Sequence, residues 1–191
     1  MRKNILILVS FLLIVLAARS QKIQYGGIQQ LGLVVGETKF STSFHMINGI
    51  RFKRIFTGLG ADAQFNRRLN YDYNHSGNTY NTSAFFVDLR YYINKKKNFF
   101  VLGDAGVNYI NEKLSSSERT TYTKQPGYYA GIGVGFKARI GKEVFYSFDV
   151  NYCTKQTRYT YSYQNFINQW QTEKYNLIQN CILVRMGIEI F

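Results

Sequence analysis

Apolar residues alternate with small or polar residues along almost the whole chain from residue 22 to residue 191. A period of two residues is typical of β-strands that have one apolar face and one polar face. The pattern predicts eight strands, with bounds near residues 22–35, 39–51, 54–66, 83–93, 98–111, 127–140, 143–157 and 175–191.

The connections between these segments alternate in length. Short turns are expected at residues 52–53, 94–97 and 141–142. Long polar stretches are expected at residues 67–82, 111–126 and 158–174, and the connection at 36–38 is a short exception on their side. An even number of strands with this alternation is typical of an up-and-down barrel whose two ends lie beside the short turns.

The last two strands show how the two faces differ. In residues 143–157, aromatic and aliphatic side chains occupy one face, and polar residues such as Asp149 occupy the other. In residues 175–191, aliphatic side chains again occupy one face, and the residues on the other face include Arg185. A membrane barrel needs this arrangement because its strands meet lipid on the outside and a polar lumen on the inside. We therefore predict one all-β domain over residues 21–191, an eight-stranded antiparallel up-and-down transmembrane β-barrel.

Residues 1–20 have the features of a secretory signal peptide. Arg2 and Lys3 precede an apolar run over residues 5–17, and small residues precede an expected cleavage site before Gln21. The run is shorter than the about 20 residues that a membrane-spanning helix needs, and an uncleaved N-terminal anchor is the alternative. A barrel behind such a signal is expected in the outer membrane of the cell.

Charged residues of both signs fall on the predicted inward face. They are Arg51, Asp62, Asp88, Arg90, Asp104, Lys137, Arg139, Asp149, Arg185 and Glu189. An eight-stranded barrel is only wide enough to be filled by its own side chains, so we expect these charges to pair across a filled lumen. A catalytic pair of carboxyl groups is disfavoured, because a filled lumen leaves no cleft for a substrate.

The register of the last two strands can be tested on the sequence. If they fold back about Ile167, Asp149 faces Arg185 and Cys153 faces Cys181. An opposite-charge pair and a thiol pair then arise together on the inward face. The oxidising periplasm would allow a cross-strand disulfide between the two cysteines, and two buried free thiols are the alternative.

The chain is strongly basic. Its net charge of +13 falls to +10 when Arg2, Lys3 and Arg19 leave with the signal segment. The remaining basic residues are scattered through turns and loops, which disfavours nucleic acid as a partner. Outer-membrane lipid, lipopolysaccharide phosphates and acidic glycans are the expected partners of such a surface.

The sequence carries few signals for catalysis or cofactor binding. His45 and His75 are the only histidines, and no Cys/His metal spacing, phosphate loop or nucleotide fingerprint is present. We expect no enzyme activity, no cofactor and no metal. The alternative is a small outer-membrane lipid-modifying enzyme in which His45 or a loop residue acts at the outer rim.

Aromatic residues in or beside the long polar stretches are candidates for contact with an extracellular ligand. They are Tyr71, Tyr73, Tyr80, Tyr159, Tyr161, Tyr163 and Trp170. Aromatic rings among Asn, Ser and Thr are typical of binding surfaces. Tyr159, Tyr161 and Tyr163 have an alternative role, which is to continue the last hairpin beyond the membrane as a β-ribbon.

Three segments resemble a known family. Phe85-Phe86-Val87-Asp88-Leu89-Arg90-Tyr91-Tyr92, Leu102-Gly103-Asp104-Ala105-Gly106 and Gly131-Ile132-Gly133-Val134-Gly135 are similar to segments of the outer-membrane β-barrel domain proteins common in Bacteroidota. More distantly, the chain resembles small barrels of the OmpA and OmpX type. The resemblance implies a barrel that resides in the outer membrane, and its motifs are architectural.

The end of the sequence is similar to the terminal-strand signal that the barrel-assembly machinery recognises. The residues concerned are Ile188, Ile190 and Phe191. Phe191 is out of phase with the two isoleucines, so it is expected to kink out of the strand or to lie at the membrane interface.

Together these features favour a non-enzymatic barrel with a filled lumen that uses its outer loops for surface interaction, adhesion or envelope integrity. A soluble lipocalin-like binding barrel is a weaker alternative, because it would require every face assignment to be inverted.

Overall fold

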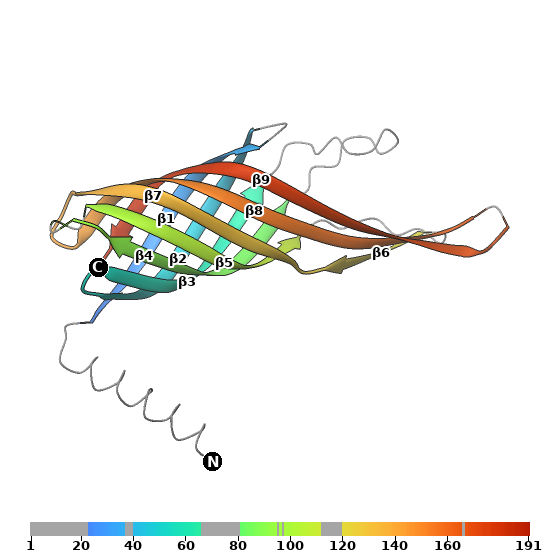
Figure 1. Cartoon of the computed structure of the whole chain (residues 1–191), viewed down its shortest axis with the longest axis horizontal. Helices are drawn as coiled ribbons and strands as arrows, with labels where there is room; N and C mark the ends of the chain where they lie inside the picture. The colour runs from blue at the N-terminus through green and yellow to red at the C-terminus, as the bar shows by residue number, and fades with distance from the viewer. Residues whose placement is uncertain are drawn as a thin grey trace, which may run out of the picture.

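The computed structural model describes residues 23–36, 40–65, 81–94, 96, 98–111, 120–165 and 167–191. These residues form nine antiparallel strands (Figure 1): β1 (Gln24–Gly36), β2 (Phe40–Phe52), β3 (Ile55–Phe65), β4 (Thr82–Tyr92), β5 (Phe99–Ile110), β6 (Thr120–Gln125), β7 (Gly127–Arg139), β8 (Val144–Gln164) and β9 (Trp170–Ile190). This part of the chain contains no helix of the length and hydropathy that a membrane-spanning helix needs.

Eight of these strands form a closed ring. Each pairs with its neighbour in the order β1, β2, β3, β4, β5, β7, β8 and β9, and β9 pairs with β1 to complete the circle. Closure leaves no strand edge unpaired within the ring. The predicted eight-stranded antiparallel barrel is therefore confirmed.

The two ends of the barrel differ. The short β2–β3, β4–β5 and β7–β8 connections, the start of β1 and the end of β9 lie at one end, which we call the turn end. At the other end, β8 and β9 continue far beyond the ring as a long two-stranded hairpin, and β6 pairs with β8 alongside it (Figure 1). We call the three-stranded part, residues 120–125, 158–164 and 170–176, the ribbon.

The ribbon departs from the predicted bounds. The sequence predicts a loop at residues 158–174, but most of them extend β8 and β9, and β6 lies within the expected loop 111–126. Between β6 and β7, the three residues 126–128 oppose only two residues of β8, 156–157. This is a β-bulge, and it falls at Pro126, which has no backbone N–H to donate to the ladder.

The outward face of the ring is apolar. Leu59 is 73% exposed and Ile132 is 69% exposed, and exposed aliphatic and aromatic side chains recur at every second position of the ring strands. Tyr25, Tyr91 and Tyr109 are exposed near strand ends, where tyrosine suits a membrane interface. The inverted, lipocalin-like alternative is wrong, because the charged series lies inside this apolar surface.

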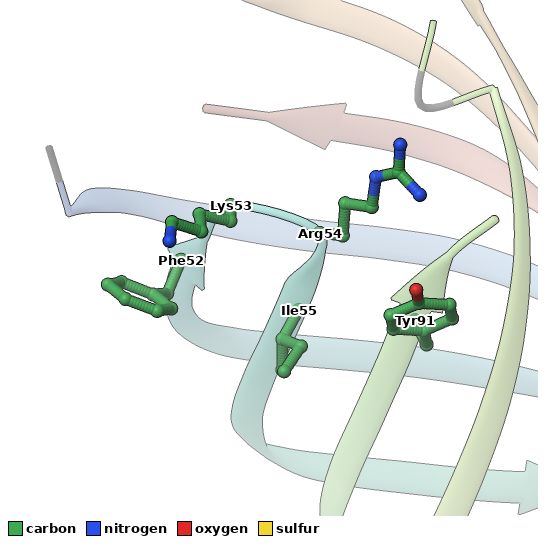
Figure 2. A pocket seen from close by; sticks show the side chains of 5 residues that line it. All are labelled: Phe52, Lys53, Arg54, Ile55 and Tyr91. Atoms are coloured by element: carbon green, nitrogen blue, oxygen red, sulfur yellow. The ribbon is translucent and has the colours of Figure 1, made fainter. Parts of the chain in front are cut away.

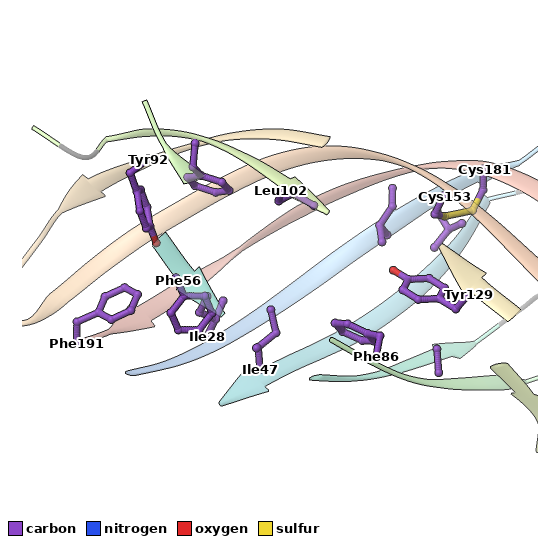
Figure 3. Close-up of a cluster of buried hydrophobic side chains, with 14 residues drawn as sticks. Ile28, Ile47, Phe56, Phe86, Tyr92, Leu102, Tyr129, Cys153, Cys181 and Phe191 are labelled. Atoms are coloured by element: carbon purple, nitrogen blue, oxygen red, sulfur yellow. A yellow bond between two sulfur atoms is a disulfide. The ribbon is translucent and has the colours of Figure 1, made fainter. Parts of the chain in front are cut away.

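The inward face combines polar side chains with a buried apolar cluster (Figure 3). At the turn end, the Phe191 ring packs edge-on against Phe56, with ring centroids 5.5 Å apart, and against Phe145 at 6.2 Å. Tyr92 packs against Phe100 at 5.7 Å. These rings close the turn end of the lumen.

Glycines make room for two of the inward rings. Gly60 pairs with Phe86 across β3 and β4, and a Cβ atom added to Gly60 would overlap the Phe86 ring. Gly135 has the same relation to Phe100 across β7 and β5. A small residue opposite a large inward ring lets the ring lie flat over the neighbouring strand, as the narrow lumen requires.

Candidate functional site

Arg185 is at the centre of the lumen. Its Nε donates to Asp149 Oδ1 at 2.7 Å, and its Nη1 lies 2.8 Å from His45 Nε2 and 3.7 Å from Asp104 Oδ2. The other oxygen of Asp149 accepts a hydrogen bond from Gln30 Nε2 at 2.7 Å. All of these side chains are buried, so the Arg185 guanidinium joins β9 to β2, β5 and β8, and Asp149 extends the connection to β1.

A second cluster lies nearer the turn end, around Glu189. Arg90 Nη1 donates to Glu189 Oε1 at 2.8 Å, and Lys137 Nζ donates to Glu189 Oε2 at 3.2 Å. Arg90 also pairs with Asp88 at 3.2 Å on its own strand. The Lys137 ammonium lies 4.2 Å from the Tyr92 ring centroid, so it is enclosed by a carboxylate and aromatic faces.

A third cluster lies toward the ribbon. Lys155 Nζ donates to Asp62 Oδ2 at 2.9 Å and to Gln64 Oε1 at 2.6 Å. His45 Nδ1 lies 3.6 Å from Asp62 Oδ1, which links this cluster to the Arg185 cluster. Lys155 was not among the predicted lumen charges. It lies on the same face of β8 as Asp149, so the alternation along the strand could have identified it.

One predicted member of the lumen network lies outside the lumen, and another lies at its opening. Arg139 is exposed at the turn end, where its guanidinium donates to the carbonyl oxygens of Gly141 and Lys142. Arg51 is half-buried and hydrogen-bonds the side chain of Gln24. Both arginines are near strand ends, where a long side chain reaches the turn or the opening more easily than the lumen.

The position predicted for Phe191 is wrong. The ring turns into the lumen, with only 8% of the residue exposed, and the guanidinium carbon of Arg51 lies 4.3 Å from its centroid. Phe191 shares the phase of Glu189, which is the inward phase. Ile188 and Ile190 are exposed on the outward face, so the expected assembly signal has two residues toward lipid and one ring inside.

The lumen is filled by large polar side chains. Among the described residues, Asp62, Asp88, Asp104, Asp149 and Glu189 are buried carboxyl groups, and Arg90, Lys137, Lys155 and Arg185 are buried cations. Each of these four cations contacts at least one of the carboxyl groups, so most charges have an opposite partner. Such a network orders the interior and leaves its groups inaccessible to a substrate.

One group in the lumen has the composition of a metal site. Ligand atoms of His45, Asp88 and Asp104 all lie within 4.8 Å of one another. Arg185 already contacts His45 and Asp104, and Arg90 already pairs with Asp88. These guanidinium groups supply the positive charge that a metal ion would supply, so the group is explained as part of the ion network.

Cys153 and Cys181 form a disulfide. They are directly opposed in the β8–β9 pair, with Cα atoms 5.3 Å apart, and both are buried. The register is the one in which Asp149 faces Arg185 and Tyr159 faces Tyr175. The bond lies near the ribbon end of the ring, and it joins β8 to β9 two residues before Lys155, where the pairing of β8 with β7 ends.

We expect replacement of both cysteines by alanine to lower the free energy of unfolding by about 3 kcal/mol, because the bond restricts the hairpin loop in the unfolded chain. Urea unfolding of the barrel in detergent, followed by Trp170 fluorescence, measures the change. Wild-type protein treated with a reductant should unfold at the same urea concentration as the variant. Equal midpoints for oxidised wild type and variant would contradict the expectation.

The ribbon carries the described aromatic candidates. Tyr159 stacks on Tyr175 at 4.7 Å and Tyr161 stacks on Tyr163 at 5.3 Å, while Trp170 is 55% exposed beside the hairpin turn. Tyr163 OH donates to Gln171 Oε1 at 2.7 Å. The stacked tyrosines therefore continue the hairpin as a β-ribbon.

The remaining aromatic candidates, Tyr71, Tyr73 and Tyr80, lie outside the described residues, as does the predicted signal peptide, 1–20.

Solved outer-membrane barrels have a similar fold. The crystal structure of the outer membrane protein OprG from Pseudomonas aeruginosa matches with a TM-score of 0.56 at 12% identity, over 89% of this chain and 96% of that chain. A major outer membrane protein from Thermus thermophilus matches with a TM-score of 0.52 at 11% identity, over 87% of this chain and 98% of that one. No family model and no curated protein matches the sequence. At these identities the likeness shows a shared barrel fold.

Proposed function

We propose that this protein is a non-enzymatic integral barrel of the outer membrane, exported by residues 1–20, that acts through the ribbon it holds outside the cell. Its closed ring with an apolar outer face supports a position in a membrane. The likeness to small outer-membrane barrels agrees with this position, and the sequence motifs favour the Bacteroidota type, related to OmpA and OmpX. The barrel-assembly machinery is the proposed partner during insertion.

The observation that carries this proposal is a long ribbon on a barrel whose lumen is filled. The large lumen side chains Arg90, Arg185 and Tyr92 are fully buried, which disfavours a water-filled pore. The ribbon, in contrast, presents aromatic, hydroxyl and amide side chains to solvent. A rigid extension with this composition is suited to binding at the cell surface.

The outward side of the ribbon is basic. Arg158 and Lys174 are exposed and lie diagonally on one face, because Arg158 pairs with Asn176 and Thr160 pairs with Lys174. Along β8 and β9, this face continues the side of the two strands that faces lipid in the ring. The two cations are thus suited to lipopolysaccharide phosphates or to an acidic glycan above the membrane.

The alternative of a lipid-modifying enzyme has little support. Its candidate base, His45, is 0% exposed, stacks on Phe86 at 4.8 Å and contacts Arg185. An acyl chain in the membrane could not reach this imidazole without opening the barrel wall. We therefore favour binding over catalysis.

The test removes the β8 and β9 parts of the ribbon and keeps the barrel. Thr157 pairs with Leu177, so an Asn-Gly turn can replace residues 158–176 and join them directly. We expect cells that express this variant to attach to a heparin-coated surface no better than cells without the protein. The amount of folded barrel in the outer membrane should stay unchanged, because all ring pairings remain.

Two matched charge variants sharpen this test. Arg158→Gln with Lys174→Gln should reduce attachment, whereas Lys96→Gln with Lys142→Gln removes the same charge at the turn end and should leave attachment unchanged. Sensitivity of the cells to detergent, measured in parallel, reports a contribution to envelope integrity. Attachment that persists at the wild-type level after ribbon removal would overturn the adhesion proposal.

A further inference from the structure

A hollow of about 440 Å³ lies on the outer surface at the turn end (Figure 2). Its lining residues are Phe52, Lys53, Arg54, Ile55 and Tyr91. They come from the β2–β3 turn and from the end of β4, where Ile55 pairs with both Phe52 and Tyr91. The hollow therefore opens toward lipid and not toward the lumen.

The walls of the hollow are apolar. Ile55 and Tyr91 are exposed on the outward face, and Phe52 has the same outward phase on β2. These side chains are the last members of the apolar band before the turn end. An acyl chain in the adjacent membrane leaflet can thus pack against them without displacing any part of the protein.

The rim of the hollow is positively charged. Lys53 adopts a positive φ of 52°, and its Nζ lies 5.7 Å from the Phe52 ring centroid. Arg54 Nη1 donates to the carbonyl oxygen of Ile93 at 3.3 Å, which holds the guanidinium at the turn end of β4. Within the described part of the chain, neither cation has a carboxylate partner.

We propose that this hollow binds an anionic phospholipid of the periplasmic leaflet, with its headgroup at the turn that carries Lys53 and Arg54 and one acyl chain against Phe52, Ile55 and Tyr91. Two unpaired cations at the edge of an apolar surface complement a headgroup with net negative charge. A zwitterionic headgroup is a poorer fit, because its own ammonium group would compete for the phosphate. The proposal rests on the membrane position given above, but it is independent of the ribbon.

Native mass spectrometry of the full chain, purified as a folded barrel in detergent, tests this site. The probes are phosphatidylglycerol and phosphatidylethanolamine with identical acyl chains. We expect the wild type to retain phosphatidylglycerol preferentially. Replacing Lys53 by Asn and Arg54 by Gln should lower that retention by about tenfold and leave phosphatidylethanolamine unaffected. Asparagine tolerates the positive φ at residue 53, so the turn is preserved.

Two further variants separate a site from general attraction. Lys96→Gln with Lys142→Gln removes two charges from the other turns and should retain phosphatidylglycerol as the wild type does. Tyr91→Ser should weaken retention of both lipids, since it removes an apolar wall. Equal losses in the two charge variants, or no lipid preference in the wild type, would overturn the site.

A gel with unboiled and boiled samples keeps the two proposals distinguishable. A folded barrel migrates faster before boiling, so every variant can be checked for folding. Absence of a lipid preference in wild-type protein that still shows this shift contradicts the lipid site alone. Absence of the shift in the wild type contradicts the membrane barrel on which the site depends.

Discussion

Replacing Arg185 with methionine is expected to destabilise the folded barrel by about 3 to 5 kcal/mol, because it leaves buried carboxylates without their cation. Asp149 loses the 2.7 Å hydrogen bond from Arg185 Nε, and Asp104 loses its nearest guanidinium. The free energy of unfolding in urea, measured on the folded barrel in detergent, reports the loss.

The matched control removes both members of the ion pair. Arg185→Met combined with Asp149→Leu should be more stable than Arg185→Met alone, since no carboxylate then remains directly unpaired at this position. Asp104 keeps its hydrogen bond from Asn151 Nδ2 at 2.9 Å in both variants. If the double variant is no more stable than the single one, burial of an unpaired charge is not the cause of the loss.

Replacing Gly187 with valine is expected to prevent closure of the ring. Gly187 of β9 pairs with Gln30 of β1 at the seam between the first and last strands. A Cβ atom at this position would overlap the backbone oxygen of Gln29 and the Cα atom of Gln30. These backbone atoms of β1 cannot move aside as a flexible side chain can, so the loss of folding free energy should exceed the about 3 kcal/mol typical of overpacking. The unboiled sample should show no faster-migrating band.

Gly103 provides the comparison for this prediction. It lies in the middle of β5, and a Cβ atom there would meet only the backbone oxygen of Gly131, at an ordinary contact distance of 3.9 Å. Gly103→Ala should therefore change the free energy of unfolding by less than about 0.5 kcal/mol. A folded Gly187→Val barrel as stable as Gly103→Ala would contradict the geometry of the seam.

The alternation of apolar and polar residues is sufficient to predict the ring. Side chains of a strand point to opposite faces in turn, so the phase of Asp149 and Arg185 assigns the lumen side of β8 and β9. Lys155 lies on the same face as Asp149, and Phe191 lies on the same face as Arg185, so the alternation places both residues inside. For Phe191 the resemblance to an assembly signal favours the membrane interface, and the phase of the strand is the better guide.

The ribbon and the partners within the lumen are harder to predict. Residues 158–174 are mostly polar because both faces of the ribbon meet water, and the alternating Tyr159, Tyr161 and Tyr163 are the main sign of a strand. The pairing of Arg90 with Glu189 joins β4 to β9, and that of Lys155 with Asp62 joins β8 to β3. Such contacts cross the lumen, so they depend on the tilt and stagger of all eight strands and not on any local pattern.

The most direct test of the membrane barrel is fractionation of cells that express the full-length chain, followed by a gel of the outer-membrane fraction with and without boiling. A membrane barrel should be found in that fraction, and its unboiled form should migrate faster than its boiled form. A soluble protein without this shift would contradict the membrane barrel.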